Sequence, residues 1–490
     1  MRTALFLLLL LAFAAIPGSL VPQVTADPNG VRAYEIQNPT LYPILDALGV
    51  FNTYGSVWFS AIYLLLFVSL IGCIIPRARH HWGALRSRPP RTPARLERMA
   101  GFSTASGQAD AAAALSSATS QLKRLGYRTE TFGASVSAER GYLRETGNLV
   151  FHMALVGILV AVGFGGGFGF TGQRIVVEGS KFVNAEGDYD TISPGRFVDT
   201  DDLSPFRIVV DDFEVRYEAE NKNAYGQAGG YVAHVTNTLA DGSTQKAQIK
   251  VNEPLEIGGT QVYLLGNGYA PTVTVRDPEG TVVWTDDVPF LPQDANLTSQ
   301  GVIKVPDGLA EQVGMIGFLY PTVATLPSGA LASSFPDLND PVLSLQVYAG
   351  DLGINDGEPK SVYALNTADL TQLAGRKDAL KLTPGETVDL PDGLGTIELS
   401  ADIKRFVSLD VHRDPAQGWV LVFAILVLGG LLTGLFVPRR RVWVKVVETG
   451  GGDIRIEYAG LARGEDPTLD AAVADIAAKH STALGLKVDS

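Results

Sequence analysis

The hydrophobic pattern of the chain is dominated by four long apolar runs, at residues 4–21, 57–75, 149–170 and 419–437. Each run is close to the roughly 20 apolar residues that a helix needs in order to cross about 30 Å of hydrocarbon. None contains Asp, Glu, Lys or Arg, whose charges are costly near the centre of a bilayer. The pattern therefore predicts four transmembrane helices.

The region between the third and fourth runs has a different period. From about Arg174 to Val411, short segments alternate apolar and polar residues, and turn signals such as Asp241-Gly242 separate them. Closely spaced strands with turn signals are typical of packed antiparallel sheets. The predicted fold class is an integral membrane protein with four transmembrane α-helices and a large all-β, sandwich-like extracytoplasmic domain of one or two sheets.

The segments that flank the runs complete the predicted organisation. Residues 77–93 are rich in Arg and Pro and predict an extended linker, while 108–124 and 468–479 have helical patterns and 442–447 and 454–458 predict short strands. The predicted segments are a first helix at 1–21, an outer loop at 22–56, a second helix at 57–75, a basic cytoplasmic loop at 76–147, a third helix at 148–170, an acidic β-rich domain at 171–416, a fourth helix at 417–437 and a cytoplasmic tail at 438–490.

Charge predicts the orientation of these segments. Residues 77–147 contain 12 Lys and Arg against 5 Asp and Glu, whereas residues 22–56 contain one basic residue, Arg32. The fourth run is followed at once by Arg439, Arg440 and Arg441. Because basic loops stay on the cytoplasmic side, we expect a multi-pass protein of the plasma membrane with residues 171–416 outside the cytoplasm. The first run also resembles a secretory signal with a cleavage site near Ala26, and both interpretations place the following loop outside.

Composition excludes several classes of function. Residues 171–416 carry 17 Lys and Arg against 36 Asp and Glu, and the whole chain has a formal charge of −13. A nucleic-acid partner requires a basic face, so none is expected, and anionic lipid explains the basic loop better. The single cysteine, Cys73, leaves no intrachain disulfide and no C-x-x-C or C-x-x-C-H motif.

Two of the six histidines are candidate ligands. His152 lies inside the third run, and ionisable groups within spans usually face a bundle interior or cavity. A neutral imidazole there can ligate haem iron, or it can simply bond a neighbouring helix. His412 precedes the fourth run and lies between Asp410 and Asp414, which can orient its ring. The other four are predicted at solvated or helix-end positions: His80, His81, His234 and His480.

Small residues predict close packing of the helices. Glycines lie four residues apart at Gly163 and Gly167 in the third run and at Gly430 and Gly434 in the fourth. This spacing lets helix backbones approach closely within a bundle or against another membrane protein. No nucleophile, zinc-peptidase, phosphate-loop or dinucleotide motif is present, so no catalytic residue is predicted.

Several short strings occur in a characteristic order along the chain. They are residues 16–23, Trp58-Phe59, 72–77, 125–128, 139–142, 147–152, 172–179, 211–217, 251–255, 384–386, Asp414-Pro415 and 436–443. Each string is weak alone, but together they cover nearly the whole chain and fit the four runs. In this order they resemble the ResB family of System II cytochrome c biogenesis proteins.

The resemblance implies a function. Members of this family work with a second membrane protein, ResC (also called CcsA), to carry haem to the outer face and to support its covalent attachment to apocytochrome c. His152 matches the histidine proposed as a haem ligand in the third span, and His412 matches a polar position before the last span. The expected cofactor is haem b, bound transiently and shared with ResC/CcsA. The chain is then not an enzyme by itself but part of a haem-lyase complex.

A second class of function explains the topology and composition equally well. In this alternative the chain is a membrane-anchored β-domain scaffold or sensor with no haem role. The alternative does not account for a histidine within the third span or for the ordered family strings.

Overall fold

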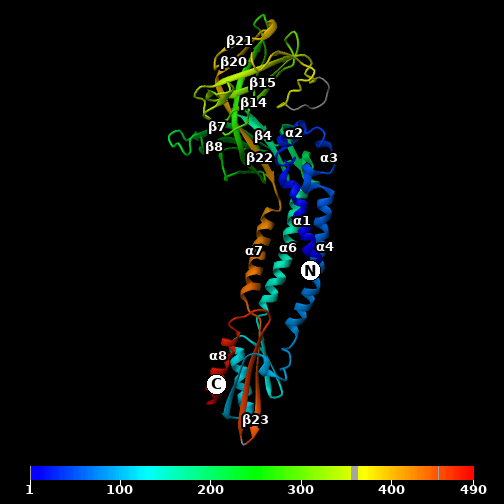
Figure 1. Ribbon diagram of the computed structural model, residues 1–490, viewed down its shortest axis with the longest axis vertical. Helices are drawn as coiled ribbons and strands as arrows, with labels where there is room; N and C mark the ends of the chain where they lie inside the picture. Colours follow the sequence, from blue (N-terminus) through cyan, green and yellow to red (C-terminus); the bar gives the residue numbers. More distant parts are fainter. Residues whose placement is uncertain (1, 355–361, 451, 490) are drawn as a thin grey trace. The chain divides into compact units, whose positions relative to one another are not determined.

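The computed structural model describes residues 2–354, 362–450 and 452–489. The chain divides into two compact units, which we call unit 1 (Met1–Phe164 and Ala416–Ser490) and unit 2 (Gly165–Pro415). Four long apolar helices and a large all-β region of antiparallel sheets are present among the described residues, so these two parts of the predicted fold class are confirmed (Figure 1).

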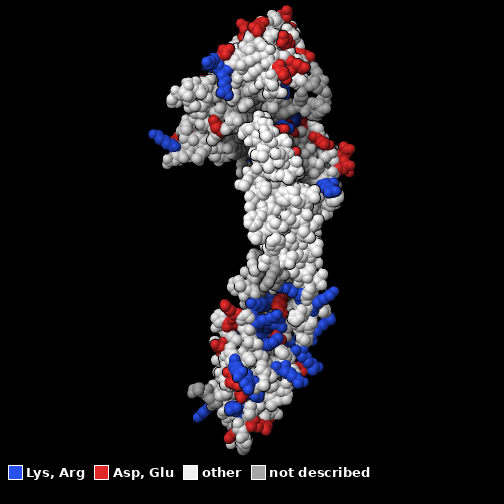
Figure 2. Space-filling view, turned by 45° about the vertical axis from the view of Figure 1, so that its right-hand side comes forward, with Lys and Arg blue, Asp and Glu red and all other residues white. Residues whose placement is uncertain are grey.

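The four long helices match the four apolar runs. They are α1 (Arg2–Leu20), α4 (Val57–Arg86), α6 (Leu143–Phe168) and α7 (Gln417–Phe436). Large apolar side chains such as Leu5, Leu65 and Leu435 are exposed on them, as expected of surfaces that face lipid. Figure 2 shows this part of unit 1 almost free of charged side chains, with basic residues gathered where the helices give way to the sheet domain described below.

Helix α4 extends well beyond the predicted end of the second run. Its 30 residues correspond to about 45 Å of helix at 1.5 Å per residue. Pro76 lies inside this helix and does not terminate it, although proline usually does. The prediction of an extended linker was therefore wrong for residues 77–86, which form the last turns of α4.

Helices α6 and α7 cross through glycine backbones. A Cβ atom added to Gly430 would lie 2.6 Å from the backbone nitrogen of Phe151 and 2.7 Å from the carbonyl oxygen of Gly147. The prediction of close packing at Gly430 is confirmed. A Cβ on Gly163 would meet no atom within 4 Å, so that glycine does not serve this crossing. Helix α4 contacts α6 where the Tyr63 hydroxyl donates to the Leu159 carbonyl at 2.5 Å.

The loop between α4 and α6 and the tail after α7 together form one six-stranded antiparallel sheet. We call this sheet and the helices packed on it the sheet domain. The strand order is β2-β3-β23-β24-β1-β25, so strands from the loop after α4 and strands from the tail after α7 are interleaved in one sheet, as the mixture of blue-cyan and orange-red strands in Figure 1 makes visible. The strands are β1 (Ala100–Gln108), β2 (Arg128–Phe132), β3 (Ser135–Arg140), β23 (Arg440–Gly450), β24 (Asp453–Ala462) and β25 (Lys487–Asp489).

Two helices cover one face of this sheet. Helices α5 (Ala111–Arg124) and α8 (Leu469–Leu484) pack Leu122 and Val473 against strand residues such as Val444. Asp110 caps α5 by accepting from the Ala113 amide at 2.7 Å, which satisfies a first-turn donor. The loop and the tail were predicted as two separate small elements, whereas the structure joins them into one domain.

The described residues of unit 2 form three larger antiparallel sheets and a two-stranded one, more than the one or two predicted. The first sheet consists of β4 (Phe170–Val177), β6 (Thr191–Pro194), β10 (Leu255–Ile257), β11 (Thr260–Arg276), β12 (Val282–Asp287), β21 (Thr387–Asp389) and β22 (Thr396–Arg413). The second consists of β5 (Lys181–Val183), β7 (Phe206–Tyr217), β8 (Ala228–Leu239) and β9 (Thr244–Lys250). The third consists of β13 (Leu291–Pro292), β14 (Ser299–Val305), β15 (Val313–Tyr320), β18 (Val342–Ala349), β19 (Thr371–Ala374) and β20 (Leu380–Leu382). Strands β16 (Val323–Thr325) and β17 (Leu331–Ser333) form the hairpin.

The paired long strands β11 and β22 connect two hydrophobic cores. One core packs Val262 and Leu409 against Ile208 of the second sheet. The other packs Val273 and Ile397 of the same two long strands against residues of the third sheet, including Leu345. The β11–β22 register shifts twice between these regions, and such bulges bend and twist a strand pair. One strand pair therefore serves two sandwich-like layers.

The segment between α1 and α4 is short and helical. It contains α2 (Pro28–Gln37), α3 (Tyr42–Ala47) and the 3-10 helix η1 (Val50–Gly55). Phe51 is buried and packs against the rings of Tyr34 and Tyr42, with ring centres 5.2 and 5.0 Å away. Gln23, just after α1, stabilises the segment, because its Oε1 accepts a hydrogen bond of 3.0 Å from the Thr53 amide.

Candidate functional site

A pocket of about 810 Å³ lies among α4, α6 and α7, at their ends next to the sheet domain. All of its lining residues belong to unit 1. Pockets of about 300–1,000 Å³ are typical of small-molecule sites. The lining residues are Ile74, Pro76, Arg77, His80, His81, Arg144, Glu145, Asn148, Leu149, Phe151, His152, Gly430, Leu431, Gly434, Leu435, Arg463 and Gly464.

The pocket is chemically divided. Apolar side chains from all three helices, including Ile74, Leu149 and Leu431, line it toward the membrane-spanning part of the bundle. Charged and imidazole side chains line it toward the helix ends and the loop after β24. A ligand that fits this pocket has an apolar body and a polar edge.

His152 lines this pocket and has one ring nitrogen assigned by its partner. Its Nδ1 lies 2.7 Å from the backbone carbonyl oxygen of Asn148. A carbonyl oxygen only accepts hydrogen bonds, so Nδ1 carries the proton and donates it. The neutral ring then leaves a lone pair on Nε2, which is the form in which histidine ligates iron. The His152 side chain is half-buried.

The structure also brings His80 and His81 into the same pocket. The prediction of a solvated position was wrong for His81, because only 8% of its side chain is exposed. Its Nε2 lies 2.9 Å from the Thr146 hydroxyl and its Nδ1 lies 3.5 Å from Glu145. His80 is exposed and lines the pocket from the neighbouring position on α4.

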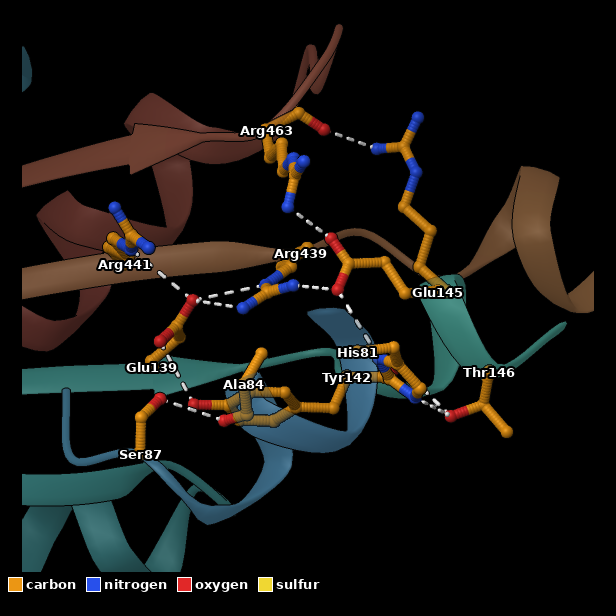
Figure 3. Close-up of polar contacts among 11 residues, drawn as sticks. His81, Ala84, Ser87, Glu139, Tyr142, Glu145, Thr146, Arg439, Arg441 and Arg463 are labelled. Carbon is orange, nitrogen blue, oxygen red and sulfur yellow. Dashed lines mark hydrogen bonds and ion pairs between the residues drawn. The ribbon is translucent and has the colours of Figure 1, made fainter. Parts of the chain in front are cut away.

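A buried ion-pair network lies beneath the pocket. Arg439, with 5% of its side chain exposed, donates to Glu139 from Nη2 at 2.7 Å and from Nε at 3.0 Å. It also pairs with Glu145, which in turn pairs with Arg463. Figure 3 shows Arg439 between the two carboxylates, with Arg441 on the far side of Glu139. The network ties the start of α6 to strands β3 and β23.

The partners of Glu139 keep it ionised although it is buried. Burial alone would raise the pKa of this carboxyl, but hydrogen bonds from Arg439 and Tyr142 and the charge of Arg441 outweigh burial. The net shift of the Glu139 pKa is downward, and the same interactions raise the pKa of Arg439. Glu139 and Arg439 therefore both stay charged at neutral pH, and Arg439 also pairs with Glu145, which lines the pocket.

The second predicted ligand, His412, lies in unit 2 and is not among the residues that line the pocket of His152. It occupies the end of β22, opposite Gln261 on β11 and Thr171 on β4. Burial raises the pKa of the neighbouring Asp410 carboxyl, and the charge of His412 partly opposes that shift. His412 is half-buried and is held on a sheet rather than in a turn.

The remaining histidines have structural partners. His480 was expected at the end of a helix, and the prediction did not include its burial. In the structure its side chain is fully buried. Its Nε2 donates to the Ala114 carbonyl at 3.0 Å and its Nδ1 accepts from the Tyr458 hydroxyl at 2.9 Å. His234 is half-buried, and its Nε2 lies 3.3 Å from Oε1 of the exposed Glu214. With the exposed Asp212 they form a group in which one imidazole nitrogen and two carboxylate oxygens lie within 4.8 Å of one another.

Comparison with known proteins identifies relatives of this chain. A family model described as the ResB-like family matches residues 1–474. A protein named cytochrome c biogenesis protein CcsB from Synechococcus sp. (strain WH7803) is 24% identical over 459 residues, covering 91% of this chain and 88% of the relative. The CcsB protein of Synechococcus sp. (strain CC9605) is 25% identical over 460 residues, covering 90% and 87%. The CcsB protein of Microcystis aeruginosa is 27% identical over 191 residues, covering 37% and 41%. The family match includes His152, His412 and every residue that lines the pocket.

Proposed function

Since this chain belongs to the ResB-like family and is a membrane protein of cytochrome c biogenesis, we propose that it holds haem in the pocket among α4, α6 and α7. The single observation that carries this proposal is the state of His152. Its Nδ1 donates to Asn148, so Nε2 is available in a pocket with apolar walls. Haem bound there would supply an iron centre for that nitrogen and a flat apolar ring for the walls.

The pocket fits the demands of a carrier. Haem is the cargo and not a resident cofactor, so it must be held firmly enough not to leak into lipid and loosely enough to be released. Apolar side chains such as Leu149 and Leu431 shield the ring, while one neutral imidazole provides a single reversible bond. The carbonyl of Asn148 fixes the orientation of that imidazole before haem arrives.

The proposed orientation places the sheet domain in the cytoplasm. One sheet is built from the segments that flank the spans, and a single sheet cannot lie on both sides of a bilayer. Its two contributing segments are the basic ones, which favour the cytoplasmic side of the plasma membrane. Haem would therefore enter from the cytoplasm, and unit 2 would lie outside.

Delivery requires partners that this chain does not supply. In this proposal ResC/CcsA forms a complex with the chain and shares the haem, and His412 serves as a ligand or a ResC contact at the outer face. Unit 2, with its excess of acidic residues, positions the apocytochrome c whose thiols receive the haem. Crosslinking of a haem-binding apocytochrome segment to residues 171–416 checks this assignment, and an absence of such crosslinks counts against it.

Deleting the gene in its own host tests the function. We expect all c-type cytochromes to disappear while b-type cytochromes remain, because only covalent attachment is affected. Complementation with His152→Ala should restore little c-type cytochrome, whereas complementation with His234→Ala should restore it fully. A deletion strain with normal c-type cytochromes would refute the proposal.

The purified protein separates this proposal from a scaffold or sensor role. A haem carrier recovered alone or with ResC/CcsA shows a haem absorption band, and a scaffold with no haem role does not. The presence of His152 in the pocket favours the carrier.

A further inference from the structure

We propose that this pocket selects ligands that carry two carboxylates. An excess of positive charge at its end next to the sheet domain would bind them. The inference rests on the proposed function and deepens it. It assigns Arg144 and Arg463 as specificity-determining residues. It also orients the haem, with both propionates toward the sheet domain and the ring toward the apolar helix walls.

The charges of the lining residues carry this inference. The pocket is lined by three arginines, Arg77, Arg144 and Arg463, and by one carboxylate, Glu145. Three positive charges against one negative leave a net of two positive charges when the histidines are neutral. A ligand with two carboxylates neutralises that excess, and arginine binds carboxylates with paired, charge-assisted hydrogen bonds.

The spacing along α6 sets the orientation. Arg144, Asn148 and His152 lie four residues apart, so they share one face of the helix. The rise from Arg144 to His152 is about 12 Å. Helical side chains lean toward the N-terminus, which carries the Arg144 guanidinium further toward the sheet domain. A ring centred near His152 therefore presents its charged edge to Arg144 and its apolar edge to the bundle.

The two arginines can accept a ligand at small cost. Arg144 donates from one nitrogen to the Arg463 carbonyl, and a guanidinium has five N–H donors. Arg463 pairs with Glu145 and has 65% of its side chain exposed. Its guanidinium can turn from Glu145 to a ligand carboxylate without leaving a buried charge unpaired, because Glu145 keeps Arg439.

The decisive experiment compares haem with its dimethyl ester, which keeps the iron and ring but lacks both carboxylates. Binding is measured by spectroscopic titration of the full chain in phosphatidylcholine nanodiscs. We expect Arg144→Gln and Arg463→Gln each to weaken haem binding about tenfold, the loss of one charge-assisted hydrogen bond. The same variants should leave diester binding within about twofold, since uncharged groups gain little from an arginine.

Two further variants separate this role from a structural one. Glu145→Gln removes the competing carboxylate, so we expect tighter haem binding and unchanged diester binding. Lys479→Gln removes an exposed positive charge on α8, outside the pocket, and should change neither. A general loss of packing would weaken binding in both variants and for both ligands. It would not make Arg463→Gln weaken and Glu145→Gln strengthen haem binding while diester binding stays unchanged.

The outcomes distinguish the inference from the function on which it rests. Suppose that the wild-type chain binds haem and its diester with equal affinity, and that His152→Ala binds neither. This result would overturn the carboxylate assignment and leave the haem site intact. Haem binding that His152→Ala does not change would overturn the proposed site itself. Loss of the arginine effects in nanodiscs with phosphatidylglycerol would show that these residues bind lipid phosphate, which also overturns the assignment.

Discussion

Unit 2 and the sheet domain of unit 1 are both built from antiparallel strands, but they bury different kinds of residues. The buried polar residues described in unit 2 are uncharged, for example Asn184, Asn237 and Ser299. The sheet domain and the adjoining helix ends bury His81, Glu139, Arg439, Arg440, Glu457 and His480. Of these, His81 lines the pocket and Arg439 pairs with Glu145, which also lines it. Since buried charges add little stability compared with apolar packing, their presence there indicates a positioning role.

The two regions also differ in how the chain builds them. Unit 2 is one continuous segment, Gly165–Pro415, and many of its strands pair with near neighbours, although β22 pairs with the distant strands β4 and β11. The sheet domain pairs Arg140 with Arg440 across a separation of 300 residues. Its strands therefore hold the ends of α4, α6 and α7 together, which is where the pocket lies. Damage to each region should have a different consequence.

The largest expected effect comes from breaking the buried network. Arg439→Met leaves Glu139 and Glu145 without their shared partner, and removing one member of a buried ion pair costs about 3–5 kcal/mol. We expect unit 1 to become protease-sensitive in detergent at a lower temperature, with loss of haem, while unit 2 fragments remain resistant. Pulse proteolysis with fragment analysis measures both units in one sample.

The exposed member of the same network provides the control. Arg441→Met removes a side chain that is 38% exposed and contacts Glu139 at 3.2 Å, so we expect a loss below about 1 kcal/mol. Equal effects of the two substitutions would mean that burial does not set the strength of this network.

A cavity in unit 2 should produce the reverse pattern. Leu345 is fully buried in the core between the first and third sheets, and Leu345→Ala should destabilise unit 2 by about 2–5 kcal/mol. Haem absorption by this variant should be unchanged, because the pocket proposed for haem is lined by unit 1 alone. Haem loss in this variant, with unit 1 still protease-resistant, would contradict the assignment of the pocket to unit 1 alone.

Helix packing gives a smaller expected effect. In Gly430→Ala the new methyl group meets backbone atoms of Phe151 and Gly147, and overpacking of this kind costs about 1–3 kcal/mol. We expect weaker haem binding, because α6 must shift near His152. Gly163→Ala is the matched control, since its methyl group meets no atom within 4 Å, and titration with haem should find it unchanged.

The smallest expected effect is a pH dependence confined to the sheet domain. Burial lowers the pKa of His480 below its ordinary value of 6.5, so its contribution to stability is present above pH 6.5 and is lost as the pH falls. Hydrogen bonding from Arg440 lowers the pKa of Asp466 from 3.8 to about 2. That contribution is present above pH 3.8 and is lost toward pH 2.

Thermal denaturation monitored by proteolysis between pH 7.5 and 5 checks the histidine window. Unit 1 should lose stability over this range, and His480→Gln should remove that slope while lowering stability at every pH. An unchanged slope in His480→Gln would assign the pH dependence to another group.

Local pattern was sufficient to predict the elements whose signals are strong. The four apolar runs, the strands of the tail and the helix that became α8 follow from periods that neighbouring residues set. His152 was found because an ionisable residue is rare within an apolar run. The extension of α4 was missed because the Arg- and Pro-rich composition of residues 77–93 predicted a linker, although Arg77, His80, His81 and Ala84 continue the helical spacing.

The pocket could not be predicted, because distant pairing forms it. Nothing near Arg439, Arg463 or Glu145 indicates that these residues meet. They meet because β3 pairs with β23 and β23 with β24, and such pairings depend on the whole sheet rather than on local sequence. The burial of His81 follows from the same assembly, since Thr146 and Glu145 of α6 cover it.

The central claim is that Nε2 of His152 ligates haem iron, and added imidazole tests it most directly. The absorption spectrum of purified His152→Ala is recorded with haem before and after imidazole is added to the sample. We predict weak, altered haem absorption without imidazole and recovery of the wild-type spectrum with it, because the free ring replaces the missing ligand. A variant with wild-type haem content and spectrum before imidazole is added would contradict the account.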